Sequence, residues 1–222
     1  MTQRQQPEGI QAEVYAAFGL CFRFLSQAYL EPPDEKWLTR VKEDDMFSEW
    51  PLPGREQMAE GLRRMQAYFS DWSPADLDQL KEDFTRLFIG LESTLAPPYE
   101  SVYIGRDQIL FDQSTLVIRD VYARFGLEIS NRGAEPEDHI GYELEFVSLL
   151  CQKTVDALNS EDRPGADTFQ QAALEFTRNH LLNWIQPFTE KVIAAARTDY
   201  FRGVAHLTCG TAAMFDELIK AE

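Results

Sequence analysis

The sequence predicts an all-α fold, and three observations support this prediction. Apolar residues recur at three- and four-residue spacing along most of the chain, which is the period of an amphipathic helix. The sequence lacks the sustained alternation of apolar and polar residues that predicts β-strands. The one alternating stretch, residues 101–110, is short and interrupted by Gly105 and charged residues. With 222 residues and 44% hydrophobic content, the chain can bury a substantial core. We therefore expect a single globular multi-helix domain over residues 1–222.

Four helices are predicted in the first 90 residues. Apolar side chains follow a helical period from residue 10 to residue 30, and the pair Pro32-Pro33 ends this run. Ser73 is a suitable N-cap, Pro74 a suitable first helical residue, and Asp76 stands at the capping-box position, so a helix begins there. The expected helices are 10–30, a short helix after Pro33, 58–69 and 74–90.

The longest predicted connection runs from Gly90 to Asp112, where the helical period is lost. A connection of this length in a compact helical domain is more often functional or a hinge than idle. A helix follows over 116–125, and Gly126 stands where a left-handed C-terminal cap is expected. The connection 126–136 is where a hinge between an N-terminal part (1–125) and a C-terminal part (137–222) would lie.

The next helix is predicted to begin at Pro136. Proline suits the first helical position because its missing N–H costs nothing there. Glu137 and Asp138 would then place negative charge at the positive end of the helix dipole. After a turn at 160–165, the periodicity predicts three further helices, over 169–182, 184–196 and 200–219.

The charge balance restricts the class of partner. The chain carries 21 Lys and Arg against 37 Asp and Glu, which gives a formal charge of −16. This charge argues against nucleic acid or an anionic membrane as partner and favours a cationic one. Solubility alone is the competing interpretation, since acidic proteins without cationic ligands are common.

The location is predicted to be cytoplasmic, without stable membrane insertion. The first residues show no apolar run behind a basic start, and no window approaches the ~18 apolar residues that a membrane span needs. The three cysteines, at positions 21, 151 and 209, are far apart and form no CxxC pair. We expect them to be reduced packing residues.

Residues 135–147 join a cluster of acidic groups to one histidine. His139 and Glu143 are four residues apart, with Asp138 beside them, and this spacing can hold a metal ion. The set is incomplete, because the chain contains neither HExxH nor paired ExxH motifs, nor a nucleophile motif or phosphate-binding glycine loop. Helix capping and surface polarity are the alternative roles for these residues.

A second candidate group is aromatic. Tyr99 and Tyr103 lie in the long connection, where packing does not obviously require them, so they are candidates for lining a groove. Glu100, Asp138 and Glu143 could then meet a cationic ligand, because an arginine pairs with a carboxylate through two parallel hydrogen bonds. Solvated surface is the competing interpretation.

These residues resemble the TorD/DmsD group of redox-enzyme maturation chaperones, which also includes the more distant NarJ-type proteins. The most specific segment is similar to the group's E-P-x-D-H signature with its following E-x-E-F. The resemblance covers nearly the whole chain, and the segments that carry it, in the group's order, are Asp83-Phe-Thr-Arg-Leu-Phe-Ile-Gly90, Pro97-Pro-Tyr-Glu-Ser-Val-Tyr103, Ser114-Thr-Leu-Val-Ile-Arg119, Glu135-Pro-Glu-Asp-His-Ile-Gly-Tyr-Glu-Leu-Glu-Phe146 and His180-Leu-Leu-Asn-Trp184.

The resemblance implies an all-helical cytoplasmic chaperone of anaerobic respiration that performs no bond chemistry and needs no cofactor. It would bind the twin-arginine leader of a molybdenum-cofactor oxidoreductase and hold the apo form of that catalytic subunit until the cofactor is inserted. The leader-binding surface carries over onto Leu87, Phe88, Tyr99, Ser101, Tyr103, Pro136, Asp138 and His139. Tyr99 stands where some relatives carry tryptophan, which keeps an aromatic wall.

A leader that joins an arginine pair to an apolar segment needs carboxylates beside an apolar groove. Our hypothesis is that Asp138, with Glu143 or Glu100, receives the arginines. The groove would be lined by Leu87, Phe88, Tyr99 and Tyr103, and His139 would orient its neighbours or contact the leader backbone.

Two other functions stay open at this stage. The chain could be a metal-dependent helical hydrolase that uses His139, Asp138 and Glu143, or an acidic protein that docks a folded basic partner. The sequence does not identify the molybdoenzyme client or the oligomeric state, since relatives include monomers and domain-swapped dimers.

Overall fold

The computed structural model describes residues 8–54, 56–90, 94–104, 113–129 and 136–220. Within these ranges the chain is helical and contains no β-strand, which confirms the all-α prediction. The elements are α1 Glu8–Leu30, α2 Glu35–Glu43, α3 Glu56–Asp71, a 3₁₀ turn Pro74–Asp76, α4 Leu77–Phe88, α5 Glu100–Ile104, α6 Gln113–Arg124, α7 Ile140–Asn159, α8 Arg163–Phe176, a π-helical turn Thr177–Leu181, α9 Leu182–Ala195 and α10 Asp199–Lys220.

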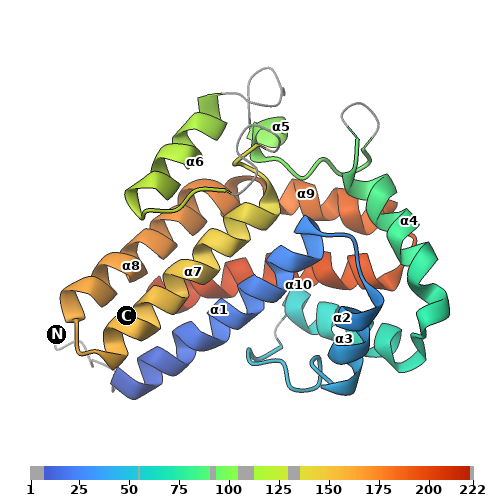
Figure 1. Cartoon of the computed structure of the whole chain (residues 1–222), viewed down its shortest axis with the longest axis horizontal. Helices are drawn as coiled ribbons and strands as arrows, with labels where there is room; N and C mark the ends of the chain where they lie inside the picture. Colours follow the sequence, from blue (N-terminus) through green and yellow to red (C-terminus); the bar gives the residue numbers. More distant parts are fainter. Residues whose placement is uncertain (1–7, 55, 91–93, 105–112, 130–135, 221–222) are drawn as a thin grey trace.

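Two packed groups of helices build the fold (Figure 1). Helix α7 lies between α1 and α8, and these three helices run side by side, while α10 packs against α3 and α9. The ring of Phe215 on α10 contacts the rings of Tyr15, Phe18 and Phe22 on α1 and so joins the two groups. Aromatic rings provide much of this core because each buries a large apolar area.

The predicted start and stop signals between residues 73 and 126 are confirmed. The Asp76 carboxylate accepts a hydrogen bond from the Ser73 backbone N–H at 2.9 Å, and the 3₁₀ turn that begins at Pro74 leads into α4. Gly126 follows α6 with φ +70°, the left-handed conformation that glycine adopts without steric cost.

Three predicted boundaries are wrong. Helix α7 begins at Ile140, not at Pro136, because Glu137 and Asp138 form a turn in which the His139 N–H donates to the Pro136 carbonyl. The connection from Gly90 to Asp112 contains the short helix α5, which has too few residues to show a period. Helix α8 begins at Arg163, six residues before the predicted start.

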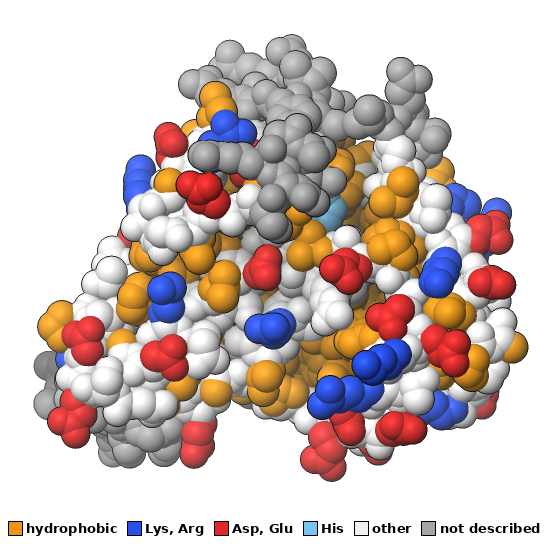
Figure 2. Space-filling model, in the orientation of Figure 1, with side chains coloured by type: hydrophobic (Ala, Val, Ile, Leu, Met, Phe, Trp, Pro, Cys, Tyr) orange, Lys and Arg blue, Asp and Glu red, His pale blue; other side chains and the backbone are white. Residues whose placement is uncertain are grey.

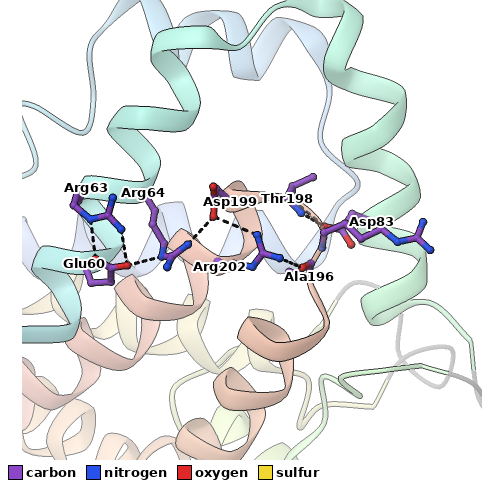
Figure 3. A network of polar contacts seen from close by, with 9 residues as sticks. Glu60, Arg63, Arg64, Asp83, Ala196, Thr198, Asp199 and Arg202 are labelled. Atoms are coloured by element: carbon purple, nitrogen blue, oxygen red, sulfur yellow. Dashed lines mark hydrogen bonds and ion pairs between the residues drawn. The ribbon is translucent and has the colours of Figure 1, made fainter.

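Helices α3, α4 and α10 are held together by a polar network (Figure 3). Arg64 on α3 pairs with Asp199 at the start of α10 at 2.6 Å. Asp83 on α4 is buried, and its Oδ2 accepts hydrogen bonds from the backbone N–H groups of Arg197 and Thr198, both at 2.9 Å. Its Oδ1 accepts a hydrogen bond from Arg86 at 2.7 Å. Asp83 therefore fixes the chain just before α10 begins.

On the face that Figure 2 shows, Asp and Glu side chains are dispersed among apolar side chains and do not gather in a single patch. Among the described helices, none combines the length and apolarity that crossing a bilayer requires. Cys21 and Cys151 are buried, Cys209 is half-buried, and all three are free thiols, as expected. The predicted hinge in 126–136 stays a prediction, because residues 130–135 lie outside the described ranges.

Replacing Asp83 by alanine should lower the free energy of unfolding by about 3–5 kcal/mol, because it removes the carboxylate partner of Arg86 and the acceptor of the buried Thr198 N–H and hydroxyl. Urea-induced unfolding measures the loss. The matched control is Glu82→Ala, which removes an exposed carboxylate that pairs with Arg197 at 2.8 Å and should cost no more than about 1 kcal/mol. Equal losses in the two variants would contradict the anchoring role of Asp83.

Candidate functional site

The site is built where the segment before α5 meets the segment before α7. The Ile140 N–H donates to the Pro98 carbonyl at 2.8 Å, and the Glu100 N–H donates to the Asp138 carbonyl at 3.0 Å. These two bonds form an isolated antiparallel bridge between Tyr99 and His139. Pro98 and Pro136 themselves have no N–H to donate, and each supplies a carbonyl acceptor to this junction.

Asp138 fixes the junction from inside. Its side chain is fully buried, Oδ2 accepts a hydrogen bond from the Ser101 N–H at 2.8 Å, and Oδ1 accepts one from the Thr115 hydroxyl at 2.9 Å. One carboxylate thus links the starts of α5 and α6 to the turn before α7. Both oxygens of Asp138 hold parts of the protein together, so the geometry favours a positioning role for Asp138, and its pairing with an arginine of a ligand stays a prediction.

Glu137 holds α6 to the same turn. Its carboxylate pairs with Arg119 on α6 through two hydrogen bonds, Nε to Oε1 at 2.5 Å and Nη2 to Oε2 at 3.0 Å. The Tyr122 hydroxyl donates to the Glu137 backbone carbonyl at 3.2 Å. Sequence reasoning missed Glu137 and Thr115 as contributors, since neither has a partner close in sequence.

His139 is the N-cap of α7. Its Nδ1 accepts a hydrogen bond from the Gly141 N–H at 3.0 Å, and burial lowers the pKa of the imidazole from 6.5 to about 3. The ring is therefore neutral at pH 7 and orients the start of the helix. A side chain at position 141 would clash with Leu30 at 2.4 Å, so glycine allows α7 to approach the end of α1.

Three carboxyl groups lie close together behind this junction, and we call Glu100, Asp138 and Glu143 the acid cluster. All three are buried, and the Trp184 indole N–H donates to Glu143 Oε2 at 3.1 Å. Burial, with the neighbouring carboxylates of Glu100 and Asp138, raises the pKa of Glu143 well above its usual value of 4.5. Glu143 therefore holds a proton to higher pH than an ordinary glutamate does.

Glu100 is the member of the acid cluster nearest to a histidine from another part of the chain. His180 Nδ1 lies 3.1 Å from Glu100 Oε2 and 3.3 Å from Oε1. Sequence reasoning did not single out His180, although it opens a segment that resembles the chaperone group. Its side chain is directed to the acid cluster by the π-helical turn, which has no periodic signal of its own.

The structure divides the predicted groove residues into two sets. Leu87 and Phe88 are buried in the core, where Phe88 contacts the rings of Tyr29 and Phe201, so they do not line a surface groove. Tyr99 and Tyr103 are half-buried. The Tyr103 ring stacks on Trp184 with centroids 5.4 Å apart, and the Lys191 ammonium lies 4.8 Å from the centroid of the Tyr103 ring. Ser101 and Pro136 are buried at the junction.

The residues proposed for a metal-dependent hydrolase are engaged otherwise. His139 Nδ1 caps α7, Asp138 accepts two hydrogen bonds, and Glu143 accepts one from Trp184. Across the described residues, no group of three or more His, Cys, Asp or Glu side chains is arranged to hold a metal ion.

A family model described as nitrate reductase delta subunit matches residues 55–190, which is more than half of the chain. The chain is 28% identical over 155 residues to the chaperone protein TorD of Vibrio parahaemolyticus, covering 70% of this chain and 68% of the relative. It is 35% identical over 109 residues to the Tat proofreading chaperone DmsD of Salmonella typhi, covering 49% and 50%. The chain belongs to the TorD/DmsD family of redox-enzyme maturation chaperones.

The matched region of this family member contains both sides of the junction and the acid cluster. The chain spans from about half to about two thirds of the length of these two relatives. The chain is also similar to a solved structure described as a redox enzyme maturation protein from Archaeoglobus fulgidus, with a TM-score of 0.45 and 19% sequence identity. The alignment covers 99% of this chain and 98% of that one.

Replacing Glu143 by glutamine should stabilise the protein progressively as the pH rises. Because the folded-state pKa of Glu143 is raised, its contribution to stability is lost as the pH climbs from about 4.5 toward that raised pKa. Glutamine has no proton to lose, so the difference in unfolding free energy should grow by at most about 1.4 kcal/mol per pH unit. Urea unfolding across this pH range measures the difference.

The matched control is Glu145→Gln, on the exposed face of the same helix, whose stability curve should run parallel to that of the wild type. A Glu143→Gln curve that also runs parallel would contradict the protonated state of Glu143.

Proposed function

We propose that the protein is a cytoplasmic chaperone that binds the twin-arginine leader of a molybdenum-cofactor oxidoreductase and keeps the apoenzyme from export until its cofactor is inserted. Membership of the family supports a chaperone role, and relatives are named for twin-arginine (Tat) proofreading. The observation that carries the proposal is the Glu100 carboxylate, which faces His180 and lies one residue from the half-buried Tyr99. Arginine side chains need such a carboxylate, and the apolar part of a leader needs such an aromatic wall.

The proposed site gives different roles to the predicted residues. Glu100 receives an arginine, with the neutral carboxyl of Glu143 behind it, and Tyr99 and Tyr103 face the apolar part of the leader. Asp138, His139, Ser101 and Pro136 position these groups by holding the junction together. Leu87 and Phe88 support the site from the core. This assignment explains why a family of peptide-binding proteins would bury carboxylates, since a charge held in a fixed place away from water pairs strongly with an incoming cation.

Exposed apolar side chains flank the junction and extend the proposed surface. Ile89 follows α4 and Ile104 ends α5, with 55% and 44% of their surfaces exposed. Leu95, between them in sequence, is 44% exposed. In the proposal they contact the leader and the first residues of the client.

Affinity purification of the protein from an anaerobically grown lysate of its own host tests the function as a whole. We expect peptide mass spectrometry to identify a molybdoenzyme precursor whose leader is uncleaved. Failure to recover such a precursor, in cells shown to express one, would contradict the proposal.

Replacing Glu100 by glutamine should weaken binding of a synthetic twin-arginine leader peptide at least tenfold, because a hydrogen bond to a charged group is worth about 1.5–3 kcal/mol. Fluorescence anisotropy of a labelled peptide measures the dissociation constant. Glutamine preserves the shape of the side chain, and thermal unfolding checks that the fold is kept. Glu145→Gln, which removes an exposed carboxylate from α7, should leave the affinity unchanged. Equal affinities in all three proteins would remove Glu100 from the site.

A further inference from the structure

His180 occupies the outer side of the acid cluster. It belongs to the π-helical turn Thr177–Leu181 between α8 and α9, and its ring stacks on Phe176 with centroids 4.7 Å apart. π-Helical turns are rare and occur frequently at functional sites, because they redirect a side chain that a regular helix would place elsewhere. Here the turn brings an imidazole nitrogen to within 3.1 Å of the Glu100 carboxylate.

A pocket opens on the other side of His180. It lies between α6 and α8, has a volume of about 260 Å³ and is lined by Val121, Arg124, Phe125, Ala172, Glu175, Phe176, Asn179 and His180. At about 30 Å³ per water molecule, this volume holds roughly nine waters and is large enough for a long side chain. The formal charges of Arg124 and Glu175 cancel, while the half-buried Phe125 is an aromatic side chain on which a guanidinium can stack. His180 thus separates an open pocket from a buried carboxylate.

Two hydroxyl groups next to the acid cluster lack partners. Among the described residues, the Ser101 and Tyr103 hydroxyls on α5 are buried and have no hydrogen-bond partner. Glu143, in contrast, hydrogen-bonds to Glu100 and to the Trp184 indole. Buried polar atoms normally find partners, so unpartnered hydroxyls beside a carboxylate indicate a ligand group that completes the site. An arginine provides five N–H donors in a planar fork, whereas one imidazole nitrogen serves Glu100 alone.

From this geometry we infer that, in the free protein, His180 takes the position beside Glu100 that an arginine of the leader takes in the complex. The arginine enters through the pocket between α6 and α8 and displaces His180 from Glu100. This inference rests on the proposed leader-binding function and adds the route of entry and the basis of selectivity. In the free protein the imidazole satisfies Glu100 and keeps the cluster closed. In the complex the guanidinium fork pairs with Glu100 and reaches the unpartnered hydroxyls on α5. A lysine ammonium lacks the planar fork, so arginine is preferred.

The test compares wild type with His180→Phe, which keeps the stack on Phe176 but removes the nitrogen that holds Glu100. The probe is a labelled synthetic peptide with two consecutive arginines before an apolar segment, and matched peptides carry two lysines or two glutamines instead. At mildly alkaline pH, we expect His180→Phe to bind the arginine peptide about tenfold more tightly, as removal of a competing charged hydrogen bond predicts. The glutamine peptide should bind both proteins equally, and wild type should prefer arginine to lysine.

A second pair of variants connects the effect to Glu100. In a Glu100→Gln background, adding His180→Phe should change the affinity no further, because the carboxylate for which the imidazole and the guanidinium compete is gone. Weaker or unchanged arginine-peptide binding by His180→Phe, or a gain that persists without Glu100, overturns the inference. Wild type that binds none of the peptides overturns the proposed function itself.

A measurement on the unaltered protein covers the case in which His180→Phe fails to fold. Nitrogen-15 NMR of the His180 imidazole should show the Nδ1 resonance shift when the arginine peptide binds, and no shift with the glutamine peptide. An Nδ1 signal that stays unchanged at saturating arginine peptide overturns the displacement.

Discussion

The Asp138 carboxylate bonds the starts of two helices to the turn before a third, and the arrangement of the candidate site depends on it. Its two carboxylate oxygens accept hydrogen bonds from the Ser101 N–H and the Thr115 hydroxyl, and its backbone carbonyl accepts one from the Glu100 N–H. These acceptors and the stacking of Tyr103 on Trp184 hold α5, because a helix of five residues is not stable by itself. The position of Glu100, and with it the distance to His180, follows from this anchor.

Burial among neighbouring carboxyl groups raises the pKa of Glu143. Negative charge in an apolar interior is costly, and three adjacent carboxylates would repel one another strongly. The raised pKa of Glu143 relieves this repulsion by keeping one group neutral, and His180 provides a hydrogen bond to Glu100. The lowered pKa of His139 keeps a second imidazole uncharged, so it caps α7 without adding charge to the cluster. The resulting site is preorganised and negative, which suits recognition of a cation and gives the family resemblance a physical basis.

The sequence predicted the helices well wherever local signals control them. The capping box at Ser73 and the left-handed Gly126 act within a few residues, and both are where the pattern placed them. The helix start predicted at Pro136 was wrong because a proline that begins a turn and a proline at the first helical position look the same in sequence. Here the hydrogen bond from the His139 N–H to the Pro136 carbonyl favours the turn. The five residues of α5 are held by contacts with the distant Asp138, which no local pattern reveals.

The sequence supplied the candidate residues, and the structure adds their geometry. The hydrogen bonds around each carboxyl group distinguish their roles, since the Asp138 oxygens accept from the starts of α5 and α6, whereas Glu100 faces His180 beside a pocket. The sequence alone does not distinguish Asp138 and Phe88 from residues that contact a ligand. The packing around them shows that they support the site from inside the protein. His180 is 80 residues from Glu100, so their contact depends on the tertiary fold. The structure of the protein with a twin-arginine leader peptide bound tests the central claim most directly. The account predicts an arginine guanidinium at hydrogen-bond distance from the Glu100 carboxylate, and a leader bound with both arginines away from Glu100 would contradict it.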